Sequence, residues 1–142
     1  MNNTFFITGT DTGIGKTFVT CILMQFIKFH HKRVIGMKPI AAGVDIKKGE
    51  TANEDVNLLN YESSLKLKVG EVNTYSFDEP IAPHIAAQKY NIEIDFKKIK
   101  THAATLKSRT DYLLIEGAGG YLVPLGESIS IADLVDELNI PI

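Results

Sequence analysis

Two kinds of hydrophobic pattern alternate along the chain and predict strands and helices. Short β-branched or aromatic runs that stop at a polar or glycine-bearing loop predict buried strands, and they lie at residues 4–8, 34–38 and 112–115. Longer stretches with apolar residues at helical spacing predict helices, and they lie at 16–29, 95–108 and 131–138. This alternation predicts an α/β fold, in which a parallel sheet carries helices on both faces.

The helix predicted over 16–29 is apolar on most of its sides. Only a thin polar stripe interrupts it, formed by Thr17, Thr20, Gln25 and Lys28. A helix of this kind is expected to lie largely buried against a sheet.

The middle of the chain shows weaker patterns. A polar loop is predicted over 43–51 and a short helix over 54–60. Residues 72–77 alternate in the manner of an exposed or edge strand, and Pro80 and Pro83 are expected to break the structure that follows.

The last third ends on an incomplete pattern. Ser130 and Asp133 predict a capping box for the helix over 131–138. Residues 139–142 resemble the opening of another strand. Because a parallel strand is normally followed by a crossover helix, we expect residues 1–142 to be one nucleotide-binding domain, or the N-terminal part of a longer one.

Composition narrows the class of protein. The chain has 142 residues and a net charge of −2, which gives no reason to expect a nucleic-acid or membrane partner. Its first ten residues lack the basic start and long apolar stretch that are typical of a signal peptide. No apolar run approaches the roughly 18 residues that a membrane helix needs. The single cysteine, Cys21, excludes an internal disulfide and is expected to be a small buried apolar residue. We therefore expect a cytoplasmic protein.

A phosphate-binding loop spans Gly9 to Thr17, between a predicted strand and a predicted helix. Its glycines aim backbone N–H groups at phosphate oxygens, and the helix N-terminus adds positive potential. Lys16 is expected to bridge the β- and γ-phosphates, and the Thr17 hydroxyl to ligate Mg²⁺. The loop therefore predicts binding of Mg·ATP in a P-loop NTPase-like fold, although its spacing is one residue longer than the common form.

Three charged residues are candidates for the same site. Glu116 follows a strand directly and precedes Gly-Ala-Gly-Gly, so it is expected to face the metal. Asp55 is the weaker candidate on local evidence, because an aspartate in a first helical turn is commonly just a favourable helix-dipole charge. Lys38 ends the second strand, where it either holds a second anion or extends into water.

Five segments together resemble the ATP-dependent dethiobiotin synthetase family. In chain order they are GTDTGIGKT at 9–17, MKPIAAG at 37–43, NEDVNLL at 53–59, EPIAPHIAA at 79–87 and LLIEGAGGYLVPL at 113–125. The longer phosphate loop is also a feature of that family.

The resemblance implies a cyclo-ligase of biotin synthesis. An amine of 7,8-diaminononanoate takes up CO₂ as a carbamate, the carbamate attacks the γ-phosphate of ATP, and the neighbouring amine closes the ureido ring. The cofactors implied are ATP and Mg²⁺, the partners are the diamine and CO₂ or bicarbonate, and a full-length protein is expected to be a homodimer.

The resemblance also implies residue roles. Lys16 and Lys38 are the implied catalytic residues, and Thr17, Asp55 and Glu116 the implied metal ligands. The implied nucleotide contacts are Gly13, Ile14, Gly15, Lys16, Thr17, Phe18, Asp55, Glu116, Gly117, Ala118 and Gly119. Thr12, Lys38 and Ala42 are the implied substrate contacts, although many members of the family have a hydroxyl residue at the position of Ala42.

Other interpretations stay open at this point. A cobyrinic-acid-type amidotransferase synthetase shares the phosphate loop but is normally fused to a glutaminase. A partner-regulated partitioning ATPase usually has an early lysine where this loop has Thr10 and Asp11. A non-enzymatic nucleotide-binding fragment is the third alternative. Family members continue past the equivalent of Ile142 into base, substrate-carboxylate and dimer contacts, so the 142-residue chain alone is expected to turn over weakly or not at all.

Overall fold

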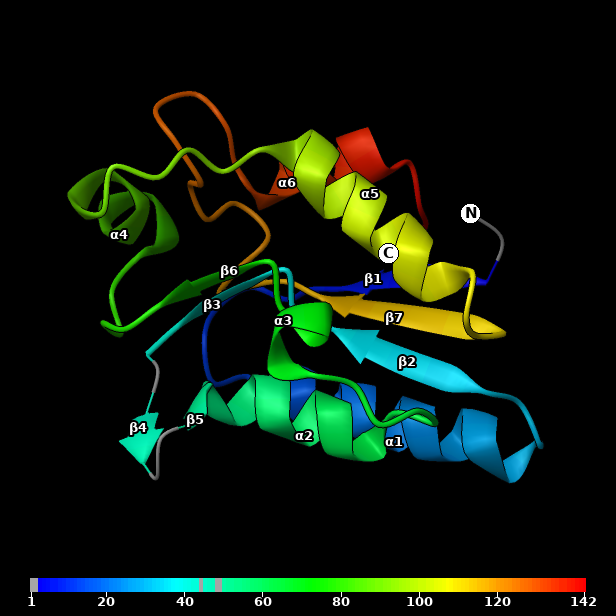
Figure 1. The fold of residues 1–142 in the computed structure, drawn as a ribbon. Helices are drawn as coiled ribbons and strands as arrows, with labels where there is room; N and C mark the ends of the chain where they lie inside the picture. The colour runs from blue at the N-terminus through cyan, green and yellow to red at the C-terminus, as the bar shows by residue number, and fades with distance from the viewer. Residues whose placement is uncertain (1–2, 44, 48–49) are drawn as a thin grey trace.

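A parallel three-stranded sheet forms the centre of the computed structural model, which describes residues 3–43, 45–47 and 50–142 (Figure 1). Its strand order is β1 (Thr4–Ile7), β7 (Tyr112–Glu116), β2 (Val34–Met37). Ile7 pairs with Glu116 and Met37 pairs with Ile115, so the carboxyl ends of the three strands lie at one edge of the sheet. The loops that leave this edge are therefore placed side by side.

A second parallel pair follows the central sheet. Strand β3 (Ile40–Ala42) begins just after β2 and pairs with β6 (Tyr75–Phe77). In β6 the two aromatic side chains are buried and Ser76 between them is exposed, so the predicted alternation is confirmed. The strand itself is shorter than predicted, because Val72 belongs to a short helix.

The region predicted as a polar loop over 43–51 contains a β-hairpin. Strands β4 (Asp45–Lys47) and β5 (Glu50–Ala52) pair antiparallel, so the loop prediction is wrong for this part of it. The prediction for Val44, Lys48 and Gly49 lies outside the described residues. Three-residue strands are too short for an alternating pattern to predict them.

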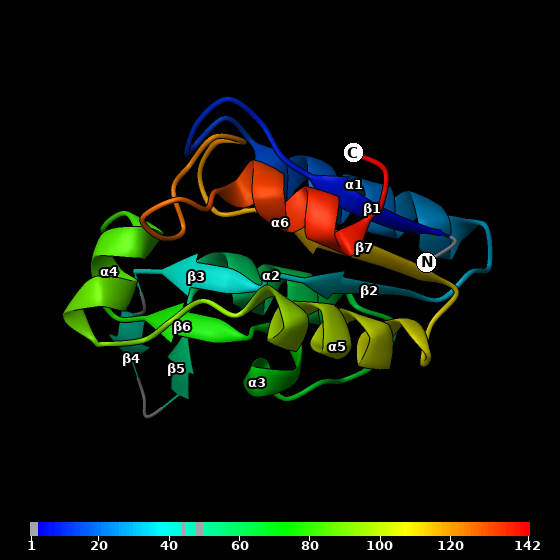
Figure 2. The same cartoon turned by 90° about the horizontal axis from the view of Figure 1, so that it is seen from above.

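Helices cover both faces of the sheet, as predicted (Figure 1). On one face lie α1 (Lys16–Phe29) and α2 (Glu54–Glu62), and on the other α5 (Phe96–Lys107) and α6 (Ile131–Leu138). Seen from above, α6 lies on the β1 side of the sheet and α5 on the β2 side (Figure 2). Within the described ranges, each helix is either too short or too polar to cross a bilayer.

The patterns that predicted α5 and α6 are confirmed. Asp95 caps α5, whose inner face buries Ile99, Ala103 and Leu106. Ser130 and Asp133 form the predicted capping box at the start of α6. The four predicted apolar positions of α6 are all buried: Ile131, Leu134, Val135 and Leu138.

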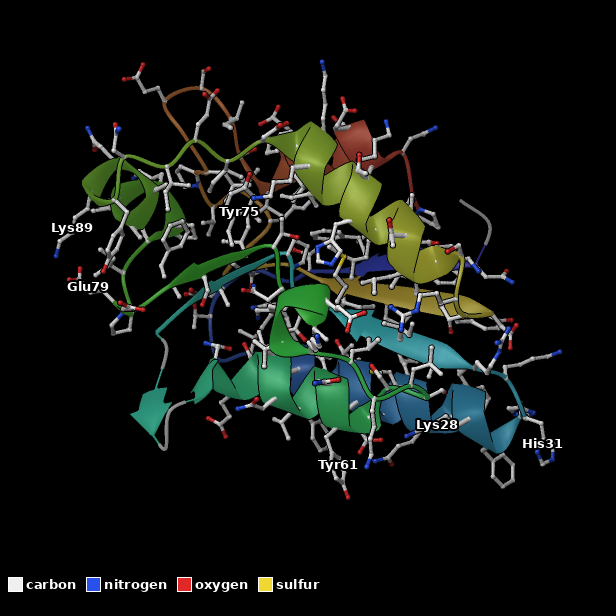
Figure 3. The ribbon with its side chains drawn as sticks, in the orientation of Figure 1. Lys28, His31, Tyr61, Tyr75, Glu79 and Lys89 are labelled. Atoms are coloured by element: carbon white, nitrogen blue, oxygen red, sulfur yellow. The ribbon has the colours of Figure 1, made fainter. Side chains whose placement is uncertain are left out.

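Two short helices, α3 (Val69–Val72) and α4 (Pro83–Lys89), escaped the sequence analysis. Pro83 does not break the structure there, because it occupies the first turn of α4, where proline lacks only an N–H that would be unpaired anyway. The other end of α4 is held by an ion pair between Lys89 and Glu79, which lie close together in Figure 3.

The prediction that α1 lies largely buried is wrong. Only Lys16, Thr20 and Met24 are buried along it, and the hydroxyl of Thr20 donates to the backbone carbonyl of Lys16. Cys21 is half-buried rather than buried. Several apolar side chains of the helix are exposed: Phe18, Val19, Ile22, Leu23, Phe26 and Phe29. The sheet and α2 cover part of the helix, and the described residues leave these apolar side chains exposed.

Residues 139–142, predicted to open a strand, lie beside β1. The backbone N–H of Phe6 donates to the carbonyl of Pro141 at 2.8 Å. No strand is assigned to this segment among the described residues.

Candidate nucleotide-binding active site

A cavity of about 640 Å³ opens where the carboxyl ends of the strands meet. Five separate segments line it: the phosphate loop with the start of α1, the end of β2, Ala42 at the end of β3, the start of α2, and the end of β7 with the loop that follows. A sixth wall comes from Pro80, Ile81, Ala82 and Pro83. The cavity therefore joins a phosphate-binding side to an apolar side.

The phosphate loop has the backbone that its glycines permit. Gly13 and Gly15 have φ angles of 74° and 97°, a left-handed region that side chains disfavour, and Gly15 is the N-cap of α1. The Lys16 ammonium donates to the carbonyl of Asp11 at 2.6 Å and is 8% exposed. Burial, and next the positive charge of Lys38, lower the pKa of Lys16. A bound anion would offset both effects on the pKa of Lys16, because it favours the charged ammonium.

Two acids, a lysine and a threonine meet beside the loop. The Lys38 ammonium donates to Asp55 Oδ2 at 2.7 Å and to Glu116 Oε1 at 2.6 Å. The Thr17 hydroxyl oxygen lies 2.8 Å from Asp55 Oδ1 and 2.8 Å from Glu116 Oε1. Residues from β7, α2, α1 and the end of β2 therefore converge within hydrogen-bonding distance.

This group is unusually deep for charged side chains. Lys38 is 5% exposed and Glu116 is fully buried, which is stable only when the charges compensate each other. Burial alone would raise the pKa of Asp55, but the charge and hydrogen bond of Lys38 outweigh it and hold that pKa below its usual value. The second carboxylate oxygen of Glu116, Oε2, is buried and has no hydrogen-bond partner among the described residues.

The glycine-rich loop after β7 braces the first half of the phosphate loop. The N–H of Tyr121 donates to the carbonyl of Gly9 at 2.8 Å. A Cβ atom on Gly120 would lie 2.4 Å from the carbonyl oxygen of Thr10, so only glycine fits there. The segment that carries Glu116 is thus tied directly to the long phosphate loop.

Most of the predicted site residues line the one cavity: Thr12, Gly13, Gly15, Lys16, Thr17, Phe18, Lys38, Ala42, Asp55, Glu116, Ala118 and Gly119. Ile14 and Gly117 do not. Ile14 is half exposed, with its side chain beside Gly9, and Gly117 is packed against the ring of Phe6. The roles assigned to all these residues remain predictions.

Two features of the site escaped the sequence analysis. One is the apolar wall at 80–83, where the sequence indicated only a family resemblance and two prolines expected to break the structure. The other is Asn53, which caps α2 and also lines the cavity. In the sequence, Asn53 could have been singled out only as a side-chain amide next to an acid. Residues of this type cap helices too often for that pattern to indicate a site.

The donor set fits a magnesium ion. The described residues contain no group of three or more histidine, cysteine, aspartate or glutamate side chains that could hold a metal. Two carboxylates and a hydroxyl are nevertheless what Mg²⁺ usually takes from a protein that also binds phosphates. The buried Oε2 of Glu116, which has no hydrogen-bond partner among the described residues, supplies a further acceptor.

Comparison with known proteins gives one matching family and several similar sequences. The family model described as an AAA domain matches residues 3–142. The chain is 41% identical over 97% of its length to a protein of Aromatoleum aromaticum and 42% identical over its whole length to one of Nitrosospira multiformis. A third, from Escherichia coli K12, is 36% identical over the whole chain.

All three relatives carry the name ATP-dependent dethiobiotin synthetase. The chain spans 61% of the length of the first two and 63% of the third. The similarity therefore covers less than two thirds of each relative.

Proposed function

Because the chain belongs to the AAA domain family, we propose that it binds Mg·ATP and acts as a dethiobiotin synthetase, the activity for which its relatives are named. The observation that carries the proposal is the buried contact of Lys38 with Asp55 and Glu116, next to Thr17 of the phosphate loop. A simple phosphate-binding loop has no need of a second buried lysine. A site that joins ATP to a second anion does.

The proposed reaction closes a cyclic urea. One amine of 7,8-diaminononanoate combines with CO₂ and loses a proton, which gives a carbamate. A carbamate oxygen attacks the γ-phosphorus and ADP leaves, which forms a carbamic–phosphoric anhydride. The second amine then attacks the carbamate carbon, and inorganic phosphate leaves with the bridging oxygen.

Two lysines supply positive charge along this path. We propose that Lys16 binds the β- and γ-phosphates and offsets the charge that builds up on the transferred group. Lys38 binds the carbamate, and Thr12 and Ala42, which line the cavity, contact the substrate. The backbone from Gly13 to Thr17 and the loop at 117–119 contact the nucleotide, joined by Phe18.

Thr17, Asp55 and Glu116 would hold Mg²⁺. When bound, the ion neutralises charge on the phosphate oxygens and orients them. The short contacts among these three side chains and the free Glu116 Oε2 support the assignment.

The same proposal extends to the location, the substrates and the oligomeric state of the protein. A cytoplasmic enzyme with small-molecule substrates agrees with the balanced charge and single cysteine of the chain. We also propose that the functional protein is a homodimer, since family members are expected to carry dimer contacts beyond the equivalent of Ile142.

A single-turnover assay tests the proposal. Protein in excess over ATP is mixed with Mg²⁺, bicarbonate and 7,8-diaminononanoate, so that even slow ring closure is detected. We expect dethiobiotin and phosphate in equal amounts, and neither when the diamine is omitted. Phosphate released at the same rate without the diamine would overturn the proposal.

The Lys38→Ala variant assigns the roles within the site. We expect it to lose product formation while its affinity for ATP stays nearly unchanged, because Lys38 is proposed to act on the carbamate. Lys100→Ala, which breaks an exposed pair with Glu137, is the matched control and should keep full activity. A large loss of ATP affinity in Lys38→Ala would instead make Lys38 a nucleotide-binding residue.

A further inference from the structure

Asn53 makes three hydrogen bonds from one side chain. Its carbonyl oxygen accepts from the backbone N–H of Asp55 at 2.9 Å, which caps α2. Its amide nitrogen donates to the carbonyl of Ala42 at 2.9 Å and to that of Gly43 at 3.1 Å. Both amide hydrogens are therefore used in bonds that an ordinary cap does not make.

These bonds join two sides of the cavity. Ala42 ends β3, and Gly43 turns the chain with a φ of 79° towards Pro80 of the apolar wall. Asp55 lies on the other side, where its two carboxylate oxygens contact Thr17 and Lys38. Asn53 itself is half-buried and lines the cavity between them.

We propose that Asn53 is a positioning residue, whose amide bridge to Ala42 and Gly43 holds the first turn of α2 where Asp55 can reach the metal. Serine, threonine and aspartate also cap helices, but a hydroxyl has only one hydrogen and a carboxylate has none, so none of them can donate to both carbonyls. The carboxylate of Asp55 must meet groups from α1 and the end of β2 at once, so a small shift of α2 breaks its contacts. The inference rests on the proposed binding of Mg·ATP.

Cap-preserving variants separate the bridge from the cap. Asn53→Ser and Asn53→Thr keep an acceptor for the N–H of Asp55 but cannot make both donated hydrogen bonds, because a hydroxyl carries a single hydrogen. Ser130→Ala is the matched control, because it removes the cap of α6 on the other face of the sheet. ATP affinity is measured by calorimetry with Mg²⁺ and again with EDTA, and the ratio of the two affinities reports the contribution of the metal.

We expect this ratio to fall by about tenfold in both Asn53 variants, a typical loss when the partner of a metal ligand is removed. Affinity for ATP in EDTA should stay at the wild-type value, and Ser130→Ala should keep the wild-type ratio. A wild-type ratio in either Asn53 variant would overturn the inference. So would an equal loss with and without Mg²⁺, or failure of both variants to fold, since the bridge would then serve the fold as a whole.

A double-mutant cycle tests whether Asn53 acts through Asp55. In an Asp55→Asn background, Asn53→Ser should cause no further change in the ratio, and a second tenfold fall would contradict the proposal. Failure of the proposed function gives a different result: the wild-type chain itself would then bind ATP no better with Mg²⁺ than in EDTA.

Discussion

At its first turn α1 places Lys16 and Thr17 in a buried polar site, whereas along its outer face it exposes Phe18, Phe26 and Phe29. In the site, charges are buried where water would solvate them better. On the outer face, aromatic rings that would normally be buried are 59–78% exposed. Each region thus reverses the usual distribution of polar and apolar side chains.

The two reversals have different energetic consequences. Buried charges remain stable only while every partner is present, so the site depends on each of its members. Exposed rings gain little from folding, because they remain in contact with water in the folded chain. The site should therefore respond strongly to single substitutions, and the outer face should respond weakly.

The largest effect is expected from removing the buried cation. Lys38→Met leaves Asp55 and the buried Glu116 without their positive partner, which typically costs about 3–5 kcal/mol of unfolding free energy. Urea unfolding at neutral pH measures it. The exposed pair of Lys100 and Glu137 serves for comparison, and Lys100→Met should change stability by no more than about 1 kcal/mol. Equal losses in the two variants would show that burial of the charges is unimportant.

The two faces of α1 give the next contrast. Met24 is fully buried, so Met24→Ala should cost about 2–5 kcal/mol. Phe26 is 59% exposed, so Phe26→Ala should lie within about 0.5 kcal/mol of the wild type despite its larger side chain. Thermal and urea unfolding check both, and a Phe26 variant as damaging as the Met24 variant would mean that the outer face is covered in solution.

An effect of intermediate size is expected from a substitution at Gly120, which packs against the phosphate loop. A Cβ at Gly120 meets the backbone of Thr10, and overpacking of this kind costs about 1–3 kcal/mol. We also expect weaker ATP affinity, because the first half of the loop must shift. Gly70→Ala is the control, since a Cβ there meets nothing within 4 Å. Unchanged ATP affinity in Gly120→Ala would show that the brace does not position the loop.

The smallest effect is expected at the contact between α1 and α2. Lys28, labelled in Figure 3, donates to Glu62 at 2.7 Å, and this hydrogen bond lowers the pKa of Glu62 below its ordinary 4.5. A lowered pKa means that the ionised form stabilises the fold above the unfolded-state pKa, and that this contribution is lost as the pH falls through the folded-state pKa.

Glu62→Gln should therefore cost about 0.5 kcal/mol at neutral pH, since Lys28 is partly exposed and water screens the pair. The difference between variant and wild type should disappear as the pH falls well below 4.5. A difference that stays constant across this pH range would contradict the assigned cause.

Periodic patterns predicted the elements that bury a regular stripe. The inner faces of α5 and α6 follow directly from apolar spacing, and the strands β1, β2 and β7 from compact apolar runs. The pattern failed for α1. Apolar spacing identifies side chains that could be buried, but it does not show whether another part of the protein packs over them. It also failed at Pro83, where position within the first helical turn decides whether proline breaks a helix or begins one.

The site was predictable where a residue type has few alternative uses. Lys16 and Thr17 follow from the phosphate loop, and Glu116 from its place at the end of a strand. The local sequence did not decide the roles of Asp55 and Lys38. The two residues are 17 positions apart, and their contact depends on the tertiary fold rather than on a sequence motif. The bridge made by Asn53 depends on two carbonyls ten and eleven positions away, so it was visible only in the structure.

Transfer of labelled oxygen tests the central claim most directly. If the carbamate attacks the γ-phosphorus, one oxygen of the CO₂ must leave in the inorganic phosphate. We predict that ¹⁸O-labelled bicarbonate, used before it exchanges oxygen with water, gives phosphate carrying one ¹⁸O atom in step with dethiobiotin. Phosphate that instead takes its new oxygen from labelled water would contradict the account, because the site would then be hydrolysing ATP.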